Sequence, residues 1–218
     1  MKPSEFHRRG LLCVVSGPAG SGKTTLCRSF SDFDDDAVYA VSATTRQPRK
    51  GETDGHDYHF LSRREFESRA TRGEFLEWAE VHTNLYGTLK SEVLRHIEAG
   101  HDVLIDIDVQ GADLVRKNSD PAIREALIDV FILPPNEEEL LSRLKKRATE
   151  SQEELDLRLS NARKEMRHWQ EYDYAIISGT KEEDFEVFKS IIQGERRRSH
   201  RLVPKTDSGS DEQPELGM

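Results

Sequence analysis

The stretch Gly17-Pro-Ala-Gly-Ser-Gly-Lys-Thr24 decides how this chain folds, because it matches the pattern G-x-x-x-x-G-K-[ST] without a gap. A short apolar run, residues 11–16, precedes it, and a helical segment, residues 24–30, follows it. A strand that passes through such a loop into a helix lets backbone N–H groups converge on one anion at the positive end of the helix. The stretch therefore predicts a phosphate-binding loop (P-loop), and not a turn that only joins a strand to a helix.

Two side chains in this loop add specific phosphate chemistry. The Lys23 ammonium places a point charge at the β- and γ-phosphates, and the Thr24 hydroxyl is a suitable ligand for Mg²⁺. We expect ATP to contact the loop and the first helical residues, namely Gly17, Pro18, Ala19, Gly20, Ser21, Gly22, Lys23, Thr24 and Thr25. The pattern alone indicates a P-loop NTPase or kinase and does not name an acceptor.

Outward from the loop, short apolar runs alternate with helical segments. We predict strands at 38–41, 103–108, 126–133 and 174–177, and helices at 90–99, 136–147, 153–170 and 182–193. This alternation is typical of an α/β fold with a parallel sheet flanked by helices. Residues 42–90 break the rhythm with two short strand-like runs, 57–61 and 75–81, and one helix that a capping box opens at Ser62. We interpret them as an inserted lobe.

Composition excludes several classes of protein. The 218 residues suit one compact domain, and a net charge of -9 argues against a general nucleic-acid binder. The apolar run at 11–15 is too short for a membrane span and lacks the shape of a signal peptide. Two cysteines, Cys13 and Cys27, are too few for a disulfide framework. We therefore predict a cytoplasmic protein that binds neither nucleic acid nor membrane, as a monomer or a homo-oligomer.

A second block of phosphate-binding chemistry begins after the first helix. Arg46 and Arg49 each offer a planar fork that fits phosphate oxygens, and Tyr58 offers a hydroxyl. Downstream, Glu77 and Tyr86-Gly87-Thr88 add a carboxylate, a phenol and a hydroxyl. Each residue alone has an ordinary surface or packing explanation. Together they predict a site that is cationic at one end and accepts hydrogen bonds from a base at the other.

With these residues in view, the sequence resembles the guanylate kinase family. The segments GPAGSGKTTL, TTRQPRKGETDGHDYHFL, GEFLEWA, YGT and LIDIDVQG are similar to that family's motifs, in its order and spacing, over residues 10–195. The resemblance implies a P-loop kinase core (11–41 and 91–195), a GMP-binding lobe (42–90) and a helical lid at about 140–165. Outside this domain, polar composition predicts a flexible leader at 1–10 and a disordered tail at 196–218.

The resemblance also implies roles for individual residues. Guanine would be held by Ser42, Glu77 and Thr88, and the GMP phosphate by Arg46, Arg49, Tyr58 and Tyr86, with Gly87 between the two groups. Asp106 and Asp108, at the end of a strand, would assist with guanine and with the Mg²⁺ shell; which aspartate does which is left open. Lys23 and Arg46 would act in catalysis with Arg147 and Arg158, which would come in from the lid. Without the resemblance, these two lid arginines would be ordinary solvated charges.

The chemistry of the two purines supports the role of Glu77. Guanine presents N1–H and a 2-amino group side by side, and one carboxylate accepts from both, whereas adenine presents an unprotonated N1 there. A site built to pair polar groups rejects the wrong partner by about 10⁴-fold or more. The acceptor phosphate is already anionic near neutral pH and needs no strong base. We expect an ATP:GMP phosphotransferase that yields ADP and GDP and also uses dGMP.

Two alternatives remain open at this stage. Some domains of this build are protein-binding scaffolds that have lost the phosphate loop, and the intact Lys23-Thr24 pair argues against that reading. A kinase of the same build that acts on a ribosyl phosphate would have no use for a guanine pocket. The chain also departs from the family pattern at Ala19, at Ala148 in the lid turn and at Ser178-Gly179, where an Asn-Asp pair is common near the adenine. We therefore make no prediction about adenine contacts at that place.

Overall fold

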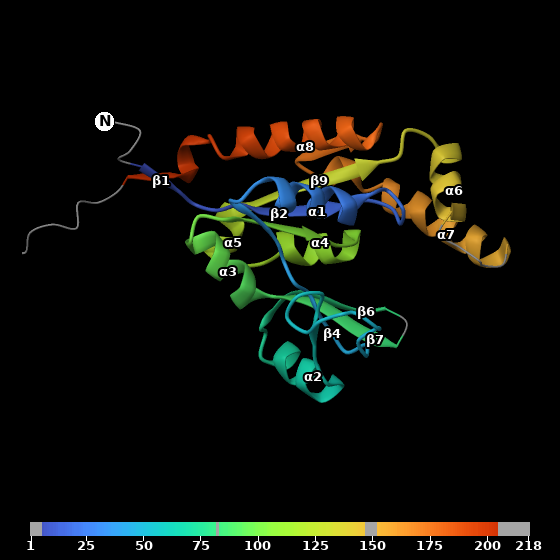
Figure 1. Ribbon diagram of the computed structural model, residues 1–218, viewed down its shortest axis with the longest axis horizontal. Coiled ribbons are helices and arrows are strands. Elements are labelled where there is room, and N and C mark those ends of the chain that lie inside the picture. The colour runs from blue at the N-terminus through green and yellow to red at the C-terminus, as the bar shows by residue number, and fades with distance from the viewer. Residues whose placement is uncertain (1–5, 82, 147–151, 205–218) are drawn as a thin grey trace, which may run out of the picture.

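A five-stranded parallel sheet forms the centre of the molecule in the computed structural model, which describes residues 6–81, 83–146 and 152–204 (Figure 1). The strand order is β10-β9-β2-β8-β3, and every pairing is parallel. The strands are β2 (Leu12–Ser16), β3 (Ala37–Tyr39), β8 (Asp102–Asp106), β9 (Leu127–Leu133) and β10 (Tyr174–Ile177). All five residues of β2 are buried, because the central strand is covered on both faces, and this explains its uninterrupted apolar run. The predicted parallel α/β fold is confirmed.

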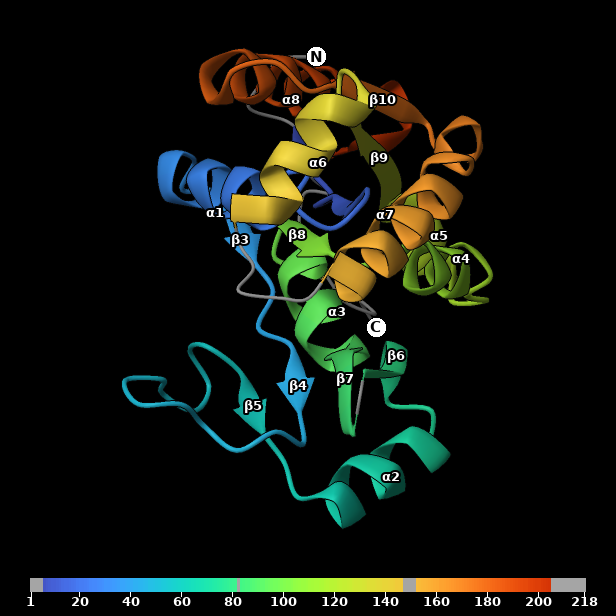
Figure 2. The ribbon, with the colours of Figure 1, turned by 90° about the vertical axis from the view of Figure 1, so that its right-hand side faces the viewer.

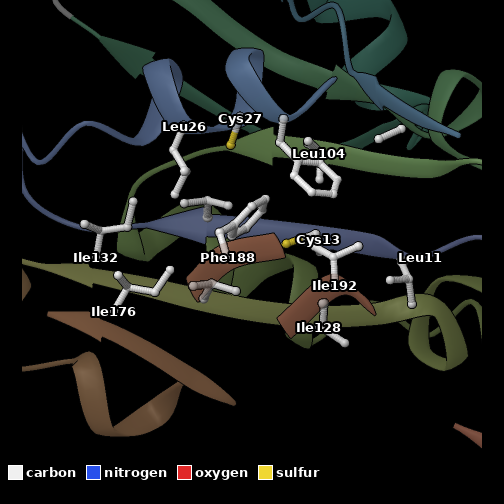
Figure 3. Packing of buried hydrophobic residues seen from close by; sticks show 14 residues of the cluster. Leu11, Cys13, Leu26, Cys27, Leu104, Ile128, Ile132, Ile176, Phe188 and Ile192 are labelled. Carbon is white, nitrogen blue, oxygen red and sulfur yellow. The ribbon is translucent and has the colours of Figure 1, made fainter. Parts of the chain in front are cut away.

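Helices cover both faces of this sheet. On one face lie α1 (Lys23–Phe33) and α8 (Lys181–Glu195), and on the other α3 (Lys90–Glu98), α4 (Val109–Arg116) and α5 (Pro121–Ala126). Side chains alternate along the central strand, so that Cys13 packs with α1 and α8 while Leu12 packs with the other three helices. Figure 3 shows Cys13 and Cys27 within the first of these clusters. Both thiols are free, and burial raises the pKa of each well above its ordinary value.

Residues 42–90 form a second, smaller sheet below the first (Figure 2). Its order is β5-β4-β7-β6, built from β4 (Ala43–Thr44), β5 (His59–Phe60), β6 (Phe75–Val81) and β7 (Asn84–Leu89), with α2 (Arg63–Thr71) packed against it. The lobe has its own core, in which the Phe66 ring of α2 stacks on Phe75 at 4.2 Å. The sequence did not predict β4 or β7, because one has two residues and the other contains Gly87.

Two helices stand at the edge of the sheet where its strands end (Figures 1 and 2). They are α6 (Glu137–Lys146) and α7 (Gln152–Met166). Asn136 precedes α6, and its Oδ1 accepts a hydrogen bond from the Glu139 backbone N–H at 2.8 Å. The pair packs through a small cluster of its own, made by Leu140, Leu144, Leu155 and Ala162. This separate core makes the two helices a unit that is distinct from the sheet. Among the described residues, no helix is long and apolar enough to span a bilayer.

The two ends of the domain depart from the expected flexible leader and disordered tail. Residues 6–8 form β1 (Phe6–Arg8), which pairs antiparallel with β11 (Leu202–Pro204). The reason is the carboxylate of Asp102, which is fully buried and accepts from Arg8, from Arg196 Nε at 2.6 Å and from the Leu11 backbone N–H at 3.0 Å. The prediction was therefore wrong for residues 6–10 and 196–204. The prediction treated Arg8 and Arg196 as solvated surface residues, whereas both neutralise the buried Asp102 carboxylate.

The Asp102 ion pairs predict a large stability effect. Asp102→Asn leaves two arginines beside a buried group that no longer carries charge, so we expect the free energy of unfolding to fall by about 3–5 kcal/mol. Asp113→Asn is the matched control, because Asp113 forms an exposed pair with Lys117, at 2.5 Å, and its loss costs about 1 kcal/mol or less. Urea unfolding at pH 7 measures both, and equal midpoints for the two variants would contradict this account.

Candidate functional site

The P-loop joins β2 to α1 at the edge of the sheet where the parallel strands end. Gly17 has φ 145°, and a Cβ there would lie 2.5 Å from the Ile132 carbonyl oxygen, so only glycine fits. Gly22 has φ 100° and is the residue before α1, which begins at Lys23. Within the part of the chain that the structure describes, no side chain caps this helix start. Its first N–H groups are therefore available to an anion, at the end of the helix that favours negative charge.

Lys23 lies across the loop. Its Nζ donates to the carbonyl oxygen of Gly17 at 2.6 Å and to that of Pro18 at 3.1 Å. The half-buried carboxyl of Glu165, on α7, is close enough to feel the Lys23 charge, which opposes the rise in the Glu165 pKa that burial causes. The α7 helix therefore comes close to the loop. Sequence reasoning did not single out Glu165, because one more acid in a charged helix gives no pattern.

Asp106 is joined to the P-loop side of the site. It ends β8, paired with Val15 of β2, and its Oδ2 accepts from Thr24 Oγ1 at 2.5 Å. Its other oxygen accepts from the Tyr39 hydroxyl, whose pKa is raised by burial and by the charge of Asp106. These contacts place Asp106 at the P-loop threonine. Sequence reasoning missed Tyr39, although its place at the end of the neighbouring strand was a usable signal.

Asp108 faces a different part of the site. It is the N-cap of α4, and its Oδ1 accepts from the Gly111 backbone N–H at 2.8 Å. Its negative charge adds to the burial that raises the pKa of Glu77. The strand ends at Asp106, and the chain turns before Asp108, so two aspartates that are two residues apart serve two different neighbourhoods.

The base end of the predicted acceptor site is a buried pair of side chains on adjacent strands. Glu77 of β6 lies opposite Thr88 of β7, and Thr88 Oγ1 donates to Glu77 Oε1 at 2.8 Å. Glu77 is 8% exposed, and Thr88 is fully buried. Burial raises the pKa of Glu77 to about 7, against the opposing effect of the Thr88 hydrogen bond. Ser42 comes directly before β4, which pairs with β7, so it lies at the same end of the small sheet.

Glycines shape both sides of this pair. A Cβ at Gly111 would lie 3.4 Å from Glu77 Oε2, so α4 approaches the second carboxylate oxygen closely. A Cβ at Gly87 would lie 2.7 Å from the Glu77 carbonyl oxygen, so β7 needs glycine at this position to pack against β6. Gly87 therefore contributes to the pocket because it has no side chain, which lets β6 and β7 pack closely beside Glu77. Gly111 was not predicted as part of the site.

The phosphate end of the predicted site already holds an internal anion. Both terminal nitrogens of Arg46 donate to the Glu52 carboxylate, each at 2.9 Å, and the Arg49 backbone N–H donates to the same carboxylate at 2.6 Å. The Arg46 guanidinium lies 5.3 Å from the centroid of the Tyr58 ring, and the Tyr58 and Tyr86 rings are 6.1 Å apart. Arg46, Tyr58 and Tyr86 are thus brought together.

Arg49 and Glu52 differ from expectation. Arg49 is exposed, and its hydrogen bond to Glu52 is made by the backbone N–H and not by the guanidinium. Glu52 was given no role, although an acid within a basic loop was a signal that it pairs there. The hydrogen bond from Arg46 to Glu52, more than any other cause, raises the pKa of Arg46. Three donors therefore converge on one carboxylate, and this is direct evidence that the loop can hold an anion.

The lid helices border the P-loop on its other side. Arg158 lies exposed on α7, and Arg147 lies outside the described residues. Arg143 of α6 donates from Nη1 to Ser178 Oγ at 3.0 Å, and Ser178 Oγ donates to Asp184 Oδ2 at 2.7 Å. These residues line a cleft of about 690 Å³ together with Gly20, Ser21, Gly22 and Thr25 of the loop region. Arg143 was not predicted as a site residue.

Comparisons with known proteins find similar sequences and a similar structure. The family model described as "Guanylate kinase" matches residues 9–195. A guanylate kinase from Agrobacterium fabrum is 41% identical over 98% of this chain and 97% of its own length, and one from Bartonella quintana is 44% identical over 89% of this chain and 86% of its own. The crystal structure of guanylate kinase from Anaplasma phagocytophilum superimposes with a TM-score of 0.71 at 32% identity and covers 91% of this chain and 92% of that one.

The raised pKa of Glu77 predicts a pH-dependent cost of folding. The folded carboxyl keeps its proton up to about pH 7, whereas its ordinary pKa is 4.5, so stability is lost as pH rises through this window. The difference corresponds to up to about 3 kcal/mol. Glu77→Gln lacks the titrating group, so its stability relative to the parent chain should rise between pH 4.5 and 7.5. Urea unfolding across that range measures it, and parallel pH profiles would contradict the pKa.

Proposed function

The chain belongs to the guanylate kinase family and transfers the γ-phosphate of ATP to GMP, and we propose how the residues of the site divide this work. The observation that carries the proposal is the presence of two anion-binding sites together with a buried acid. The P-loop and Thr24 lie in the core, whereas the Arg46 loop and the Glu77–Thr88 pair of the small sheet both lie in the lobe. ATP takes the first site, and GMP takes the other two.

Glu77 selects guanine. Its carboxylate accepts from N1–H and from the 2-amino group, while the Thr88 and Ser42 hydroxyls adapt to the remaining acceptors of the base. With 8% exposure, Glu77 has little access to water, so a base that offers no donors leaves the carboxylate unpaired. Asp108 increases the need for a donor, because its negative charge disfavours the ionised form of Glu77 when no ligand donates to the carboxylate. Asp106 belongs with the donor side of the site in this assignment.

The GMP phosphate takes the place that Glu52 holds. The Arg46 fork and the Arg49 backbone N–H already converge on a carboxylate, and a phosphate monoester offers more oxygens and more charge to the same donors. The Tyr58 and Tyr86 hydroxyls complete the set, and the exposed Arg49 side chain folds onto the phosphate. Arg46 remains charged throughout, since its pKa is raised further by Glu52.

Charge neutralisation drives the transfer itself. The Lys23 ammonium exchanges its two carbonyl partners for the β- and γ-phosphate oxygens of ATP, and the start of α1 donates N–H groups to the same oxygens. Arg158 and Arg147 approach the transferring group from the lid. The GMP oxygen is already anionic and attacks without a general base. When α6 and α7 cover the site, they exclude water, so GMP and not water accepts the phosphoryl group.

The donor set at Thr24 fits Mg²⁺. The Thr24 hydroxyl and the Asp106 carboxylate are hard oxygen ligands held 2.5 Å apart at the helix start, where ATP phosphates also arrive. We propose Thr24 as the protein ligand, with Asp106 behind it through water. When bound, Mg²⁺ would neutralise phosphate charge that Lys23 does not reach. Among the described residues no group of three His, Cys, Asp or Glu side chains is arranged as a metal site, which agrees with an ion held mostly by phosphate and water.

Three further assignments complete the proposal. The named acceptor residues contact the base and the phosphate and none is assigned to the ribose 2′-hydroxyl, so dGMP is an acceptor too. The net charge of -9 and the two free buried cysteines support a cytoplasmic protein that does not bind nucleic acid. In this proposal the protein consists of a core, a GMP-binding lobe at 42–90 and a lid formed by α6 and α7.

Glu77→Gln tests the guanine assignment. The amide presents an NH₂ group where guanine also donates, so kcat/KM for GMP should fall by about 10³-fold or more while AMP, as acceptor, changes little. The matched control is Glu80→Gln on the same strand, where the exposed carboxylate pairs with Arg63. ADP release with GMP, dGMP and AMP is measured for both variants and for the parent chain. An unchanged preference for GMP over AMP in Glu77→Gln would remove Glu77 from the base pocket.

Lys23→Met tests the phosphate loop. Loss of the point charge at the transferring group should lower kcat by about 10³-fold, while GMP binding, which uses the lobe, stays within about twofold of the parent chain. Lys117→Met is the control, because Lys117 is an exposed lysine at the C-terminal end of α4. Turnover and equilibrium GMP binding are measured on the same samples. A Lys23→Met variant with kcat close to that of the parent chain would contradict the assignment.

A further inference from the structure

Arg116 is the last residue of α4 and lies where three parts of the core meet. Its Nε donates to Asp129 Oδ2 of β9 at 2.6 Å. Its Nη1 lies 3.8 Å from Glu171 Oε2, and its guanidinium carbon lies 4.2 Å from the centroid of the Tyr172 ring. The last two residues belong to the segment that leads from the lid helix α7 back to β10. One side chain therefore ties α4 and β9 to the return end of the lid.

The return segment is fixed to β9 by a reciprocal pair of hydrogen bonds. Asp129 Oδ1 accepts from the Asp173 backbone N–H at 2.7 Å, and Asp173 Oδ2 accepts from the Asp129 backbone N–H at 3.2 Å. Two carboxylates are thus held close together, and Asp129 is only 4% exposed. Arg116 is the cation that contacts this pair through Asp129. Its positive charge stabilises an arrangement that two acids alone would oppose.

The geometry at each end of α4 gives this contact a consequence for the active site. At its start, α4 is capped by Asp108 and packs Gly111 against Glu77, so the helix is a fixed support. At its end, Arg116 holds the segment that follows α7. The α7 helix carries Arg158, and its Glu165 lies near enough to Lys23 to feel that charge. The position of the return segment therefore sets where α7 stands over the P-loop.

We propose that Arg116 is a positioning residue for phosphoryl transfer, which holds the return end of the lid helix α7 on the sheet through Asp129, Glu171 and Tyr172. This inference rests on the proposed role of α6 and α7 as the lid. Arginine suits the task because a planar fork can bond a carboxylate along one edge while its face stacks on an aromatic ring. Lysine keeps the charge but cannot make both contacts.

The test uses the full-length chain and variants that separate charge from geometry. Arg116→Lys keeps the charge and loses the fork. Arg116→Met/Asp129→Asn removes both charges together, so that no buried carboxylate is left without a counter-charge. Lys117→Gln, the neighbouring exposed lysine, is the matched control. Three quantities are measured for each: kcat with ATP and GMP, the Kd for GMP alone, and amide hydrogen exchange of residues 152–173 without ligand.

We expect the double variant to lower kcat by about tenfold and Arg116→Lys by about threefold, because misplaced catalytic groups slow transfer strongly. The Kd for GMP should stay within about twofold, since the lobe is untouched. Exchange at 152–173 should speed up by about tenfold, because the segment opens more often. Lys117→Gln should match the parent chain in all three.

A role limited to stability gives a different result. In that case the folded variants, Arg116→Lys included, would keep the kcat of the parent chain, and unfolding alone would be easier; this would overturn the proposal. Unchanged exchange at 152–173 would overturn it as well. Failure of the proposed function is distinguishable, because it would show as loss of GMP phosphorylation in the parent chain, whereas the exchange measurement needs no turnover.

Discussion

A carboxylate buried without a counter-charge is the constraint on which the acceptor site depends. Glu77 is 8% exposed, and one of its carboxylate oxygens accepts a hydrogen bond from Thr88. Burial and the like charge of Asp108 raise its pKa to about 7. Burial of such a group destabilises the free protein, and a ligand that supplies hydrogen-bond donors removes this destabilisation. Guanine supplies two of them. Selectivity for the base thus comes from a site that is left unsatisfied until the right partner binds.

The parallel sheet provides the geometry for everything else. Its strands end at one edge, where β2 leads into the P-loop and β8 leads through Asp106 and Asp108 to α4. Ligands of open α/β sheets bind outside these carboxyl ends. The lobe and the lid are both inserted at this edge (Figure 2), so acceptor and donor meet where the helix start and the arginines lie. Stability is secured at the opposite edge, by the buried ion pairs of Asp102.

Local patterns in the sequence predicted the fold well, because strand and helix periods and the P-loop glycines are short-range signals. The boundaries of β6 and β10 were predicted as the structure has them. The family resemblance assigned Thr88 and Glu77 to the same base site, and the two side chains are hydrogen-bonded. Long-range ion pairs left no such signal. Asp102 pairs with Arg8 and Arg196, and Arg116 of α4 contacts Asp129 and Glu171, so both join residues whose separation along the chain shows no period. The sequence did not distinguish Asp106 from Asp108. In the structure the chain turns between them, so Asp106 lies at Thr24 and Asp108 lies near Glu77.

The pKa of the Glu77 carboxyl, with and without GMP, tests the central claim most directly. Carbon-13 NMR of the glutamate side-chain carboxyls, assigned with Glu77→Gln, follows this one group through a pH titration. The account predicts a pKa of about 7 in the free protein and a fall to about 5 or below in the presence of saturating GMP, because two donors then stabilise the charged form. A pKa that GMP leaves unchanged would contradict it.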